Sequence, residues 1–138
     1  MEIKRYDYLP NAARQIREKV FVEEQGFQEE FDGADEISTH LLVFDGEKAV
    51  ATCRYYFNKA RGGYLVGRIA VLKECRGKKI GALMMKTVQE YLAEIGENRV
   101  YLHAQERAAA FYLKQGFAPT GEKDEEEDCP HIWMIKEW

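Results

Sequence analysis

The chain has 138 residues, 46% of them apolar, and this length suits one domain that buries roughly two-thirds of its unfolded surface. A core of that size excludes a small protein held together by disulfides. Charged residues make up 32% of the chain and the formal net charge is −4, which excludes a charge-swollen disordered chain and a globally basic nucleic-acid binder. We therefore expect a single domain over residues 1–138.

The charge is distributed unevenly along the chain. Nine Lys and Arg against one acid give residues 54–86 a net charge of +8, which leaves −12 for the remainder. Most of the negative charge comes from residues 20–47 and from residues 122–128. The basic middle favours a polyanionic partner and the acidic stretch at 20–47 favours a cationic one, whereas we interpret 122–128 as a solvated face.

The cysteines and the N-terminus indicate the compartment. Cys53, Cys75 and Cys129 are odd in number and widely spaced, with no C-x-x-C pair, so neither a disulfide framework nor a metal site is expected. The N-terminus lacks the apolar stretch of a signal peptide, and no apolar run reaches the roughly 18 residues of a membrane span. We expect a cytoplasmic protein with no metal and no membrane partner.

The first half of the chain is predicted to consist mainly of strands. These strands are expected at residues 2–6, 40–44, 49–57 and 64–71. A helix opens near Asn11, whose side chain can cap it. The turn at 45–48 joins the second and third strands, which predicts a hairpin.

The second half alternates helices and strands. The clearest helix begins near Lys79 and ends before Gly96, a residue suited to a left-handed C-terminal cap. Its apolar side chains recur at helical spacing over four turns, at Ile80, Leu83, Met84, Val88, Tyr91, Leu92 and Ile95. The elements that follow are a strand at 99–104, a helix at 106–115 closed by Gly116, and strands near 117–121 and 131–137. This alternation predicts a mixed sheet covered by helices, of the α/β (α+β) class.

The joint between the strand at 64–71 and the long helix has the features of an anion site. Free N–H groups and the positive end of the dipole, about half a unit charge, lie at a helix start. Arg76, Lys78 and Lys79 add positive charge, and Gly77 and Gly81 let a phosphate approach the backbone closely. A solubilised basic surface is the alternative. Neither a P-loop nor G-x-G-x-x-G is present, which excludes the usual NTPase and dinucleotide sites.

Two stretches resemble the signatures of the GNAT superfamily of N-acetyltransferases. The run Arg76-Gly77-Lys78-Lys79-Ile80-Gly81 is similar to the family's pyrophosphate loop, [QR]-x-x-G-x-[GA], with Lys79 in place of a glycine. The run Gln105-x-x-Ala108-x-x-Phe111-Tyr112-x-x-x-Gly116-Phe117 resembles N-x-x-A-x-x-F-Y-x-x-x-G-F. Both occur in order, about 30 residues apart. Segments at 20–25, 40–42, 102–105 and 130–134 look like the small bacterial ElaA-like branch.

The resemblance implies a fold, an activity and a coenzyme. The fold is a mixed, mostly antiparallel sheet of about seven strands flanked by about four helices. The activity is direct transfer of an acetyl group from acetyl-CoA to an amine of a small molecule or peptide, and a homodimer is compatible with it. The implied coenzyme contacts are Ile69, Ala70 and Val71 with the pantetheine arm, then Arg76, Gly77, Lys78, Lys79, Ile80, Gly81, Ala82, Gln105, Phe111 and Tyr112.

Acyl transfer from a thioester to an amine needs a proton acceptor and a proton donor. An amine of pKa about 10.4 costs roughly 4–5 kcal/mol to deprotonate at pH 7, so a base is expected. The candidates are Glu24 and His103, with His40 and His131 weaker. Tyr112 is the candidate acid, because a phenol (about 10) and a thiol (about 8.5) are close in pKa. A backbone N–H of residues 69–71 would polarise the carbonyl.

Several interpretations stay open on the sequence alone. Phe111 and Tyr112 could simply pack a helix on the sheet, and a surface ion pair is the favoured reading of Arg54. We expect seven acids to attract a cationic amine, namely Glu23, Glu24, Glu29, Glu30, Asp32, Asp35 and Glu36. The alternative functions are a non-catalytic acyl-CoA-binding or interaction domain of the same fold, and nucleic-acid binding through residues 54–86. The acceptor amine is not specified by any motif.

Overall fold

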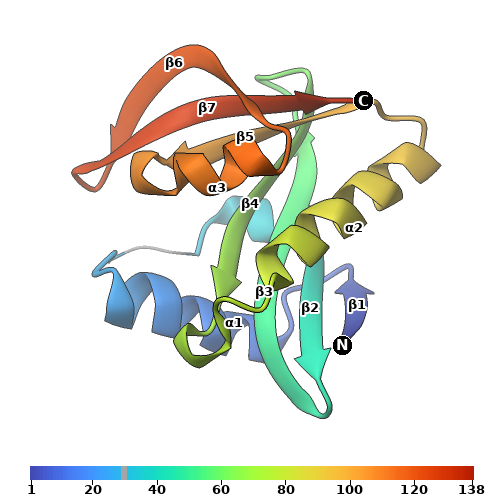
Figure 1. Cartoon of the computed structure of the whole chain (residues 1–138), viewed down its shortest axis with the longest axis vertical. Helices are drawn as coiled ribbons and strands as arrows, with labels where there is room; N and C mark the ends of the chain where they lie inside the picture. Colours follow the sequence, from blue (N-terminus) through green and yellow to red (C-terminus); the bar gives the residue numbers. More distant parts are fainter. Residues whose placement is uncertain (29–30) are drawn as a thin grey trace.

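One seven-stranded sheet, in the order β1-β2-β3-β4-β5-β7-β6, organises the computed structural model, which describes residues 1–28 and 31–138 (Figure 1). The strands are β1 (Glu2–Tyr6), β2 (Thr39–Asp45), β3 (Lys48–Asn58), β4 (Gly63–Val71), β5 (Arg99–Gln105), β6 (Ala118–Glu126) and β7 (Cys129–Glu137). Every strand pair is antiparallel except β4 and β5. The mixed, mostly antiparallel α+β architecture is therefore confirmed.

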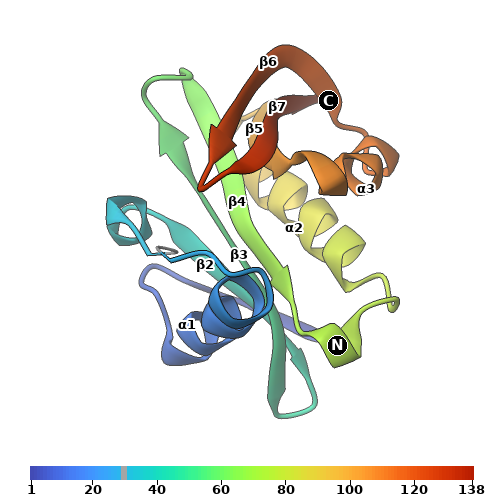
Figure 2. The ribbon, with the colours of Figure 1, turned by 90° about the vertical axis from the view of Figure 1, so that its left-hand side faces the viewer.

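The helices cover both faces of this sheet. They are α1 (Asn11–Arg17), α2 (Ile80–Glu94) and α3 (Ala109–Lys114), with short 3-10 turns η2 (Gly33–Glu36), η3 (Lys73–Cys75) and η4 (Glu106–Ala108). Figure 2 shows α1 against one face and α2 against the other. Three α-helices thus stand where about four were expected, because the segment after α1 continues it as a π-helix, η1 (Glu18–Glu24). Among the described residues, no helix is long and apolar enough to cross a membrane.

The ends of the helices differ in how well the sequence predicts them. Gly96 and Gly116 have φ of 85° and 92°, so the left-handed residues after α2 and α3 are as expected. The predicted side-chain cap at Asn11 is wrong, because Pro10 is the N-cap of α1 and no side chain caps it. Proline supplies a fixed φ instead, and Asn11 becomes the first helical residue.

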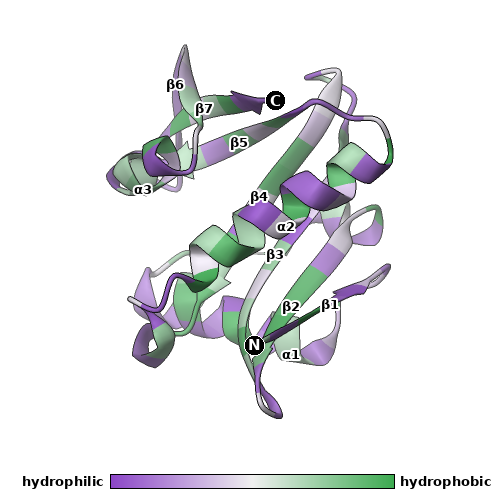
Figure 3. Ribbon diagram, turned by 45° about the vertical axis from the view of Figure 1, so that its right-hand side comes forward, coloured by the Kyte–Doolittle hydropathy of each residue, from purple (hydrophilic) through white to green (hydrophobic). Residues whose placement is uncertain are grey.

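The hydrophobic core lies between α2, the central strands and α1. Figure 3 shows hydrophobic residues along the middle of the sheet and alternating hydrophobic and hydrophilic turns on α2. Leu41, Val43, Met84 and Leu92 are fully buried there. The predicted stripe on α2 is wider than the buried one, because Leu83 and Ile95 are exposed while Met85 is buried.

The acidic run at 122–128 forms part of a hairpin and is solvent-exposed as expected, except at half-buried Glu126. β6 extends to Glu126, beyond the predicted end at 121, and pairs only with β7. Charged side chains are tolerated on such an edge strand because one side of it faces water. Glu122 nevertheless forms two hydrogen bonds with Arg61, of 2.7 and 2.8 Å.

Candidate active site

A cavity of about 310 Å³ opens where β4 and β5 separate. The two strands are paired only at Leu65–Tyr101 and Val66–Leu102. Beyond this point β4 runs toward α1 and β5 turns toward α3 (Figure 1). The backbone of β4 after Val66 is therefore bonded to β3 on one side and faces the cavity on the other. Such an edge can pair with an extended ligand.

A bulge shapes β4 at this edge. Thr52 pairs with Ala70 and Arg54 with Gly67, so β4 has one residue more than β3 between these pairs. Arg68 takes up the extra residue with φ of 50°, a left-handed conformation that is rare for arginine. Bulges re-aim the neighbouring backbone and occur next to active sites. No sequence pattern predicted this feature.

Tyr112 lies in the cavity wall on α3. It is 8% exposed, and its ring lies edge-on to Phe111 and Phe117, with centroids 5.0 and 6.0 Å away. Burial raises the pKa of the Tyr112 hydroxyl, and nearby Cys53 adds to the shift. The phenol is therefore protonated at neutral pH, which is the state that a proton donor needs.

His103 lies in the same cavity, on β5, and is held from three directions. Its Nε2 donates to Asp124 Oδ1 at 2.5 Å, and its ring stacks on Trp133 with centroids 4.5 Å apart. The ring of His131, on the neighbouring strand β7, has its centroid 4.5 Å from that of His103. Asp124, Trp133 and His131 come from the β6–β7 hairpin, so sequence reasoning had no means to join them to His103.

Glu24 does not line the cavity but binds Arg76 in the anion loop, which we define as residues 76–79 between η3 and α2. Arg76 donates two hydrogen bonds to its carboxylate, of 2.6 and 2.8 Å. These hydrogen bonds lower the pKa of Glu24. The structure thus brings together a predicted base and a predicted phosphate ligand in one ion pair, and it leaves Tyr112 and His103 in the cavity.

The anion loop between η3 and α2 has two residues with left-handed backbone. Gly77 has φ of 83°, and Lys79, the N-cap of α2, has φ of 61°. Neither Lys78 nor Lys79 has an ion-pair partner among the residues described. The lysine ammonium groups and the first N–H groups of α2 are therefore available to an anion.

Gln105, Phe111 and Gly81 lie where α3 meets its neighbours. Gln105 lines the cavity, and its side chain donates to Gln25 and accepts from Arg107, both at 2.8 Å. A Cβ on Gly81 would lie 2.9 Å from Cζ of Phe111. The glycine therefore allows the close approach of α2 and α3.

A buried ion network corrects two expectations about charge. Arg54 is 4% exposed and donates to Asp32 and Asp35, so it is not in a surface pair. Asp35 also accepts from Arg17, at 2.8 and 3.1 Å. Asp32, Asp35 and Glu24 are thus neutralised, which removes much of the field expected to attract a cationic amine. Of the other acids in that set, Glu29 and Glu30 lie outside the described residues.

The sequence matches the acetyltransferase (GNAT) domain family over residues 5–138. The chain belongs to the GNAT acetyltransferase family. The chain is 36% identical over 126 residues to the uncharacterized N-acetyltransferase YjcF of Bacillus subtilis, covering 88% of each. It is 34% identical over 131 residues to the protein ElaA of Escherichia coli, covering 91% of the chain and 86% of ElaA.

Solved structures of the GNAT family have the same fold. The crystal structure of Escherichia coli ElaA superposes with a TM-score of 0.84 at 32% identity, covering 99% of each chain. An aminoglycoside 6'-N-acetyltransferase complexed with coenzyme A shares the fold at a TM-score of 0.75 and 16% identity. The GNAT fold implies an acyl-CoA cosubstrate for this chain.

The residues present fit such a cosubstrate. The family loop has a glycine where Lys79 stands, and Lys79 adopts the left-handed backbone that glycine adopts most easily. The departure from the family pattern therefore leaves the turn of the loop in place and adds a positive charge. The open edge of β4 offers backbone groups to an extended arm.

Proposed function

We propose that the chain is an acetyl-CoA-dependent N-acetyltransferase that moves the acetyl group directly to an amine of a small molecule or peptide. One observation carries the proposal: the buried hydroxyl-bearing Tyr112 and the unpaired edge of β4 line the same cavity. A proton donor beside a strand edge is what transfer from an extended thioester requires.

The coenzyme is proposed to bind along the loop and the strand edge. Arg76, Gly77, Lys78 and Lys79 hold the phosphates together with the N–H groups of Ile80, Gly81 and Ala82. Ile69, Ala70 and Val71 bind the pantetheine arm through their backbone, and one of their N–H groups polarises the thioester carbonyl. Gln105 and Phe111 border the thioester end. The chemistry that the coenzyme supplies is an activated acetyl group.

Tyr112 is proposed to donate its proton to the departing thiolate. Burial raises the pKa of this phenol, which by itself would weaken it as an acid. Burial raises the pKa of a thiol in the same direction, as it does for buried Cys53, whose pKa it raises to about 12. A coenzyme thiol released into the same cavity is proposed to be shifted in the same direction as the phenol, which keeps proton transfer between them within reach.

Of the two proposed bases, His103 is better supported than Glu24. His103 lies in the cavity, and because its Nε2 carries the hydrogen donated to Asp124, its Nδ1 carries the lone pair of the neutral ring. Glu24 lies outside the cavity and has a lowered pKa from its hydrogen bonds with Arg76, so it accepts a proton less readily. In this arrangement Glu24 holds Arg76 in position for the coenzyme.

The test compares Tyr112→Phe with Tyr91→Phe, a matched change on α2 outside the cavity. Acetyl transfer to a panel of amines and acetyl-CoA hydrolysis are measured, together with the thermal shift caused by coenzyme A. We expect Tyr112→Phe to lower turnover about 100-fold or more with an unchanged thermal shift, while Tyr91→Phe retains the wild-type rate. Equal rates for the two variants would remove Tyr112 from the reaction.

A non-catalytic acyl-CoA-binding domain is the second candidate. The ion pair between Arg76 and Glu24 favours this second function, because the pair restrains Glu24, one of the two predicted bases. Binding of coenzyme A with no turnover for any amine would support this function. No binding of coenzyme A would exclude both functions.

A further inference from the structure

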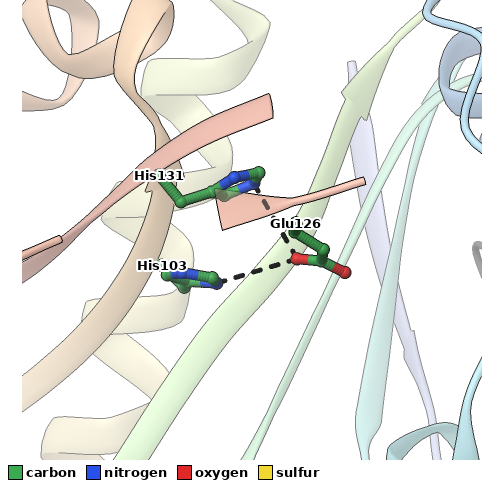
Figure 4. A group of neighbouring side chains, drawn as sticks. All are labelled: His103, Glu126 and His131. Carbon is green, nitrogen blue, oxygen red and sulfur yellow. Dashed lines mark ion pairs between the residues drawn. The ribbon is translucent and has the colours of Figure 1, made fainter. Parts of the chain in front are cut away.

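Two histidines and a glutamate meet on the cavity wall that β5 forms with the β6–β7 hairpin. They are His103 on β5, Glu126 on β6 and His131 on β7, and one potential ligand atom from each lies within 4.8 Å of the others. Glu126 Oε2 is 3.8 Å from His103 Nδ1 and 3.9 Å from His131 Nε2. Figure 4 shows both imidazole rings directed toward the same carboxylate.

The far nitrogen of each histidine ring is already used. His103 Nε2 donates to the Asp124 carboxylate at 2.5 Å, and His131 Nδ1 donates to the Cys129 carbonyl at 2.8 Å. Neither acceptor can donate, so these nitrogens carry the hydrogens. In the neutral rings the lone pairs are therefore on His103 Nδ1 and His131 Nε2, the two atoms that face Glu126. Second-shell contacts of this kind orient histidine ligands in metal sites.

We propose that His103, Glu126 and His131 form a binding site for a divalent metal ion of the zinc type. Two imidazole nitrogens and one carboxylate oxygen are a ligand set that zinc takes in open sites, with a fourth position left for water or another ligand. The His131 residue is 5% exposed, and its Nε2 has no hydrogen bond among the residues described, so a largely buried ring presents a potential ligand atom to the cluster. The cavity provides the path of access.

The arrangement has to contract to hold zinc. Bonds of about 2.0–2.1 Å at tetrahedral angles place ligand atoms about 3.3 Å apart. The distances from Glu126 Oε2 to His103 Nδ1 and to His131 Nε2 exceed this by about half an ångström, and Glu126 is half-buried at the end of an edge strand, where its side chain can rotate. The ligand atoms of the two histidines lie within 4.8 Å of each other. The two histidine rings are oriented by their second contacts, with Asp124 and with the Cys129 carbonyl.

The metal site goes beyond the proposed function and does not depend on it. Zinc binding is measured without coenzyme or amine, so its failure and that of acetyl transfer are separate results. A metal ion would use the Nδ1 lone pair of His103. A bound ion and a proton relay through His103 therefore exclude each other, and zinc is expected to inhibit acetyl transfer.

The test is a calorimetric titration of the untagged full chain with zinc chloride. It is made in a Cys129→Ser background, because a nearby thiol could bind zinc by itself. We expect one ion per chain. We also expect Glu126→Gln to weaken binding at least tenfold, Asp124→Asn to weaken it 10–100-fold, and His131→Asn to abolish it.

The matched control is Glu125→Gln, which removes an exposed neighbouring acid on the same strand and should bind zinc as the parent does. Circular dichroism melting checks each variant, and if His131→Asn unfolds, Glu126→Gln against Glu125→Gln decides. Less than one ion per chain, or the same affinity in Glu126→Gln and Glu125→Gln, would overturn the proposal.

Discussion

Lys79 has a role that its backbone decides as much as its side chain. It is in the left-handed region, with φ of 61°, which costs a non-glycine residue about 1–2 kcal/mol. The gain is a positive charge at the start of α2, where an anion would bind. Affinity for the coenzyme and stability of the fold are therefore opposed at this position.

Replacing Lys79 by glycine should stabilise the protein. Relief of the left-handed backbone exceeds the added freedom of the unfolded chain, so Lys79→Gly should raise the free energy of unfolding by about 0.5–1 kcal/mol. Urea denaturation measures it. Lys78→Gly is the control. Because Lys78 does not have a positive φ, the same change there should lower the free energy of unfolding.

Asp35 also affects stability through its immediate neighbours, and we expect its effect on the free energy of unfolding to be larger than that of Lys79. Burial by itself would raise its pKa, but hydrogen bonds and charges from Arg17 and Arg54 outweigh burial and lower the pKa. A lowered pKa contributes stability above the unfolded-state value of about 3.9, and this stability is lost as the pH falls through the folded-state value. The wild-type protein should therefore lose stability steeply below about pH 4.

Asp35→Asn should reduce that pH dependence, leaving the part that comes from other carboxyls with lowered pKa such as Asp32 and Glu24. It should also lower stability at pH 7 by about 3–5 kcal/mol, because it leaves two buried arginines short of a partner. Denaturant unfolding between pH 3 and pH 7 provides the measurement. Glu36→Gln, at an exposed neighbour, should leave both quantities unchanged. A slope below pH 4 in Asp35→Asn as steep as that of the wild-type protein would exclude a contribution of Asp35 to the acid sensitivity.

At the scale of elements, the contact between α2 and α3 connects the anion loop to Tyr112. Gly81 is in the first turn of α2 and Phe111 precedes Tyr112 on α3. The absence of a side chain at Gly81 sets the distance between the two helices. A change at this contact should therefore disturb both the loop and the phenol.

Gly81→Ala should destabilise the protein by about 1–3 kcal/mol, because the new methyl group would overlap Phe111. The double variant with Phe111→Leu should recover part of this loss, and thermal unfolding of the four proteins of the cycle measures the coupling. Gly67→Ala is the control, since open space surrounds a Cβ there. Strict additivity of the two changes would show that the helices adjust independently.

At the scale of the whole molecule, the basic middle is reduced by ion pairs. Within residues 54–86, Arg54, Arg61, Arg68 and Arg76 each pair with an acid brought from a distant segment. The lysines of the anion loop keep their charge available. The long-range attraction for a polyanion should therefore come from that loop and not from the whole segment.

Affinity for coenzyme A should fall as salt rises, because exposed charges more than about 10 Å apart are screened at 0.1 M ionic strength. Lys78→Gln and Lys79→Gln should each weaken binding and flatten the salt dependence. Lys59→Gln, within the basic middle but in the β3–β4 turn, should change neither. Calorimetric dissociation constants at several salt concentrations decide. Affinity independent of salt would exclude a charge-based contribution from the loop.

The sequence by itself determined the order of the elements, the fold class and the family. These properties follow from local patterns, each spanning a short stretch of sequence. The patterns are the alternating spacing of strands, the helical spacing of apolar residues, the glycines that end helices and the two GNAT signatures. The extent of the domain and the roles of Tyr112, His103 and Glu24 stay predictions.

Only the tertiary structure decided which side chains meet across strands. The bulge at Arg68, the burial of Arg54 and the joining of His103 with His131 depend on strand register and pairing. These bring together residues 13 to 28 positions apart, and no local pattern specifies them.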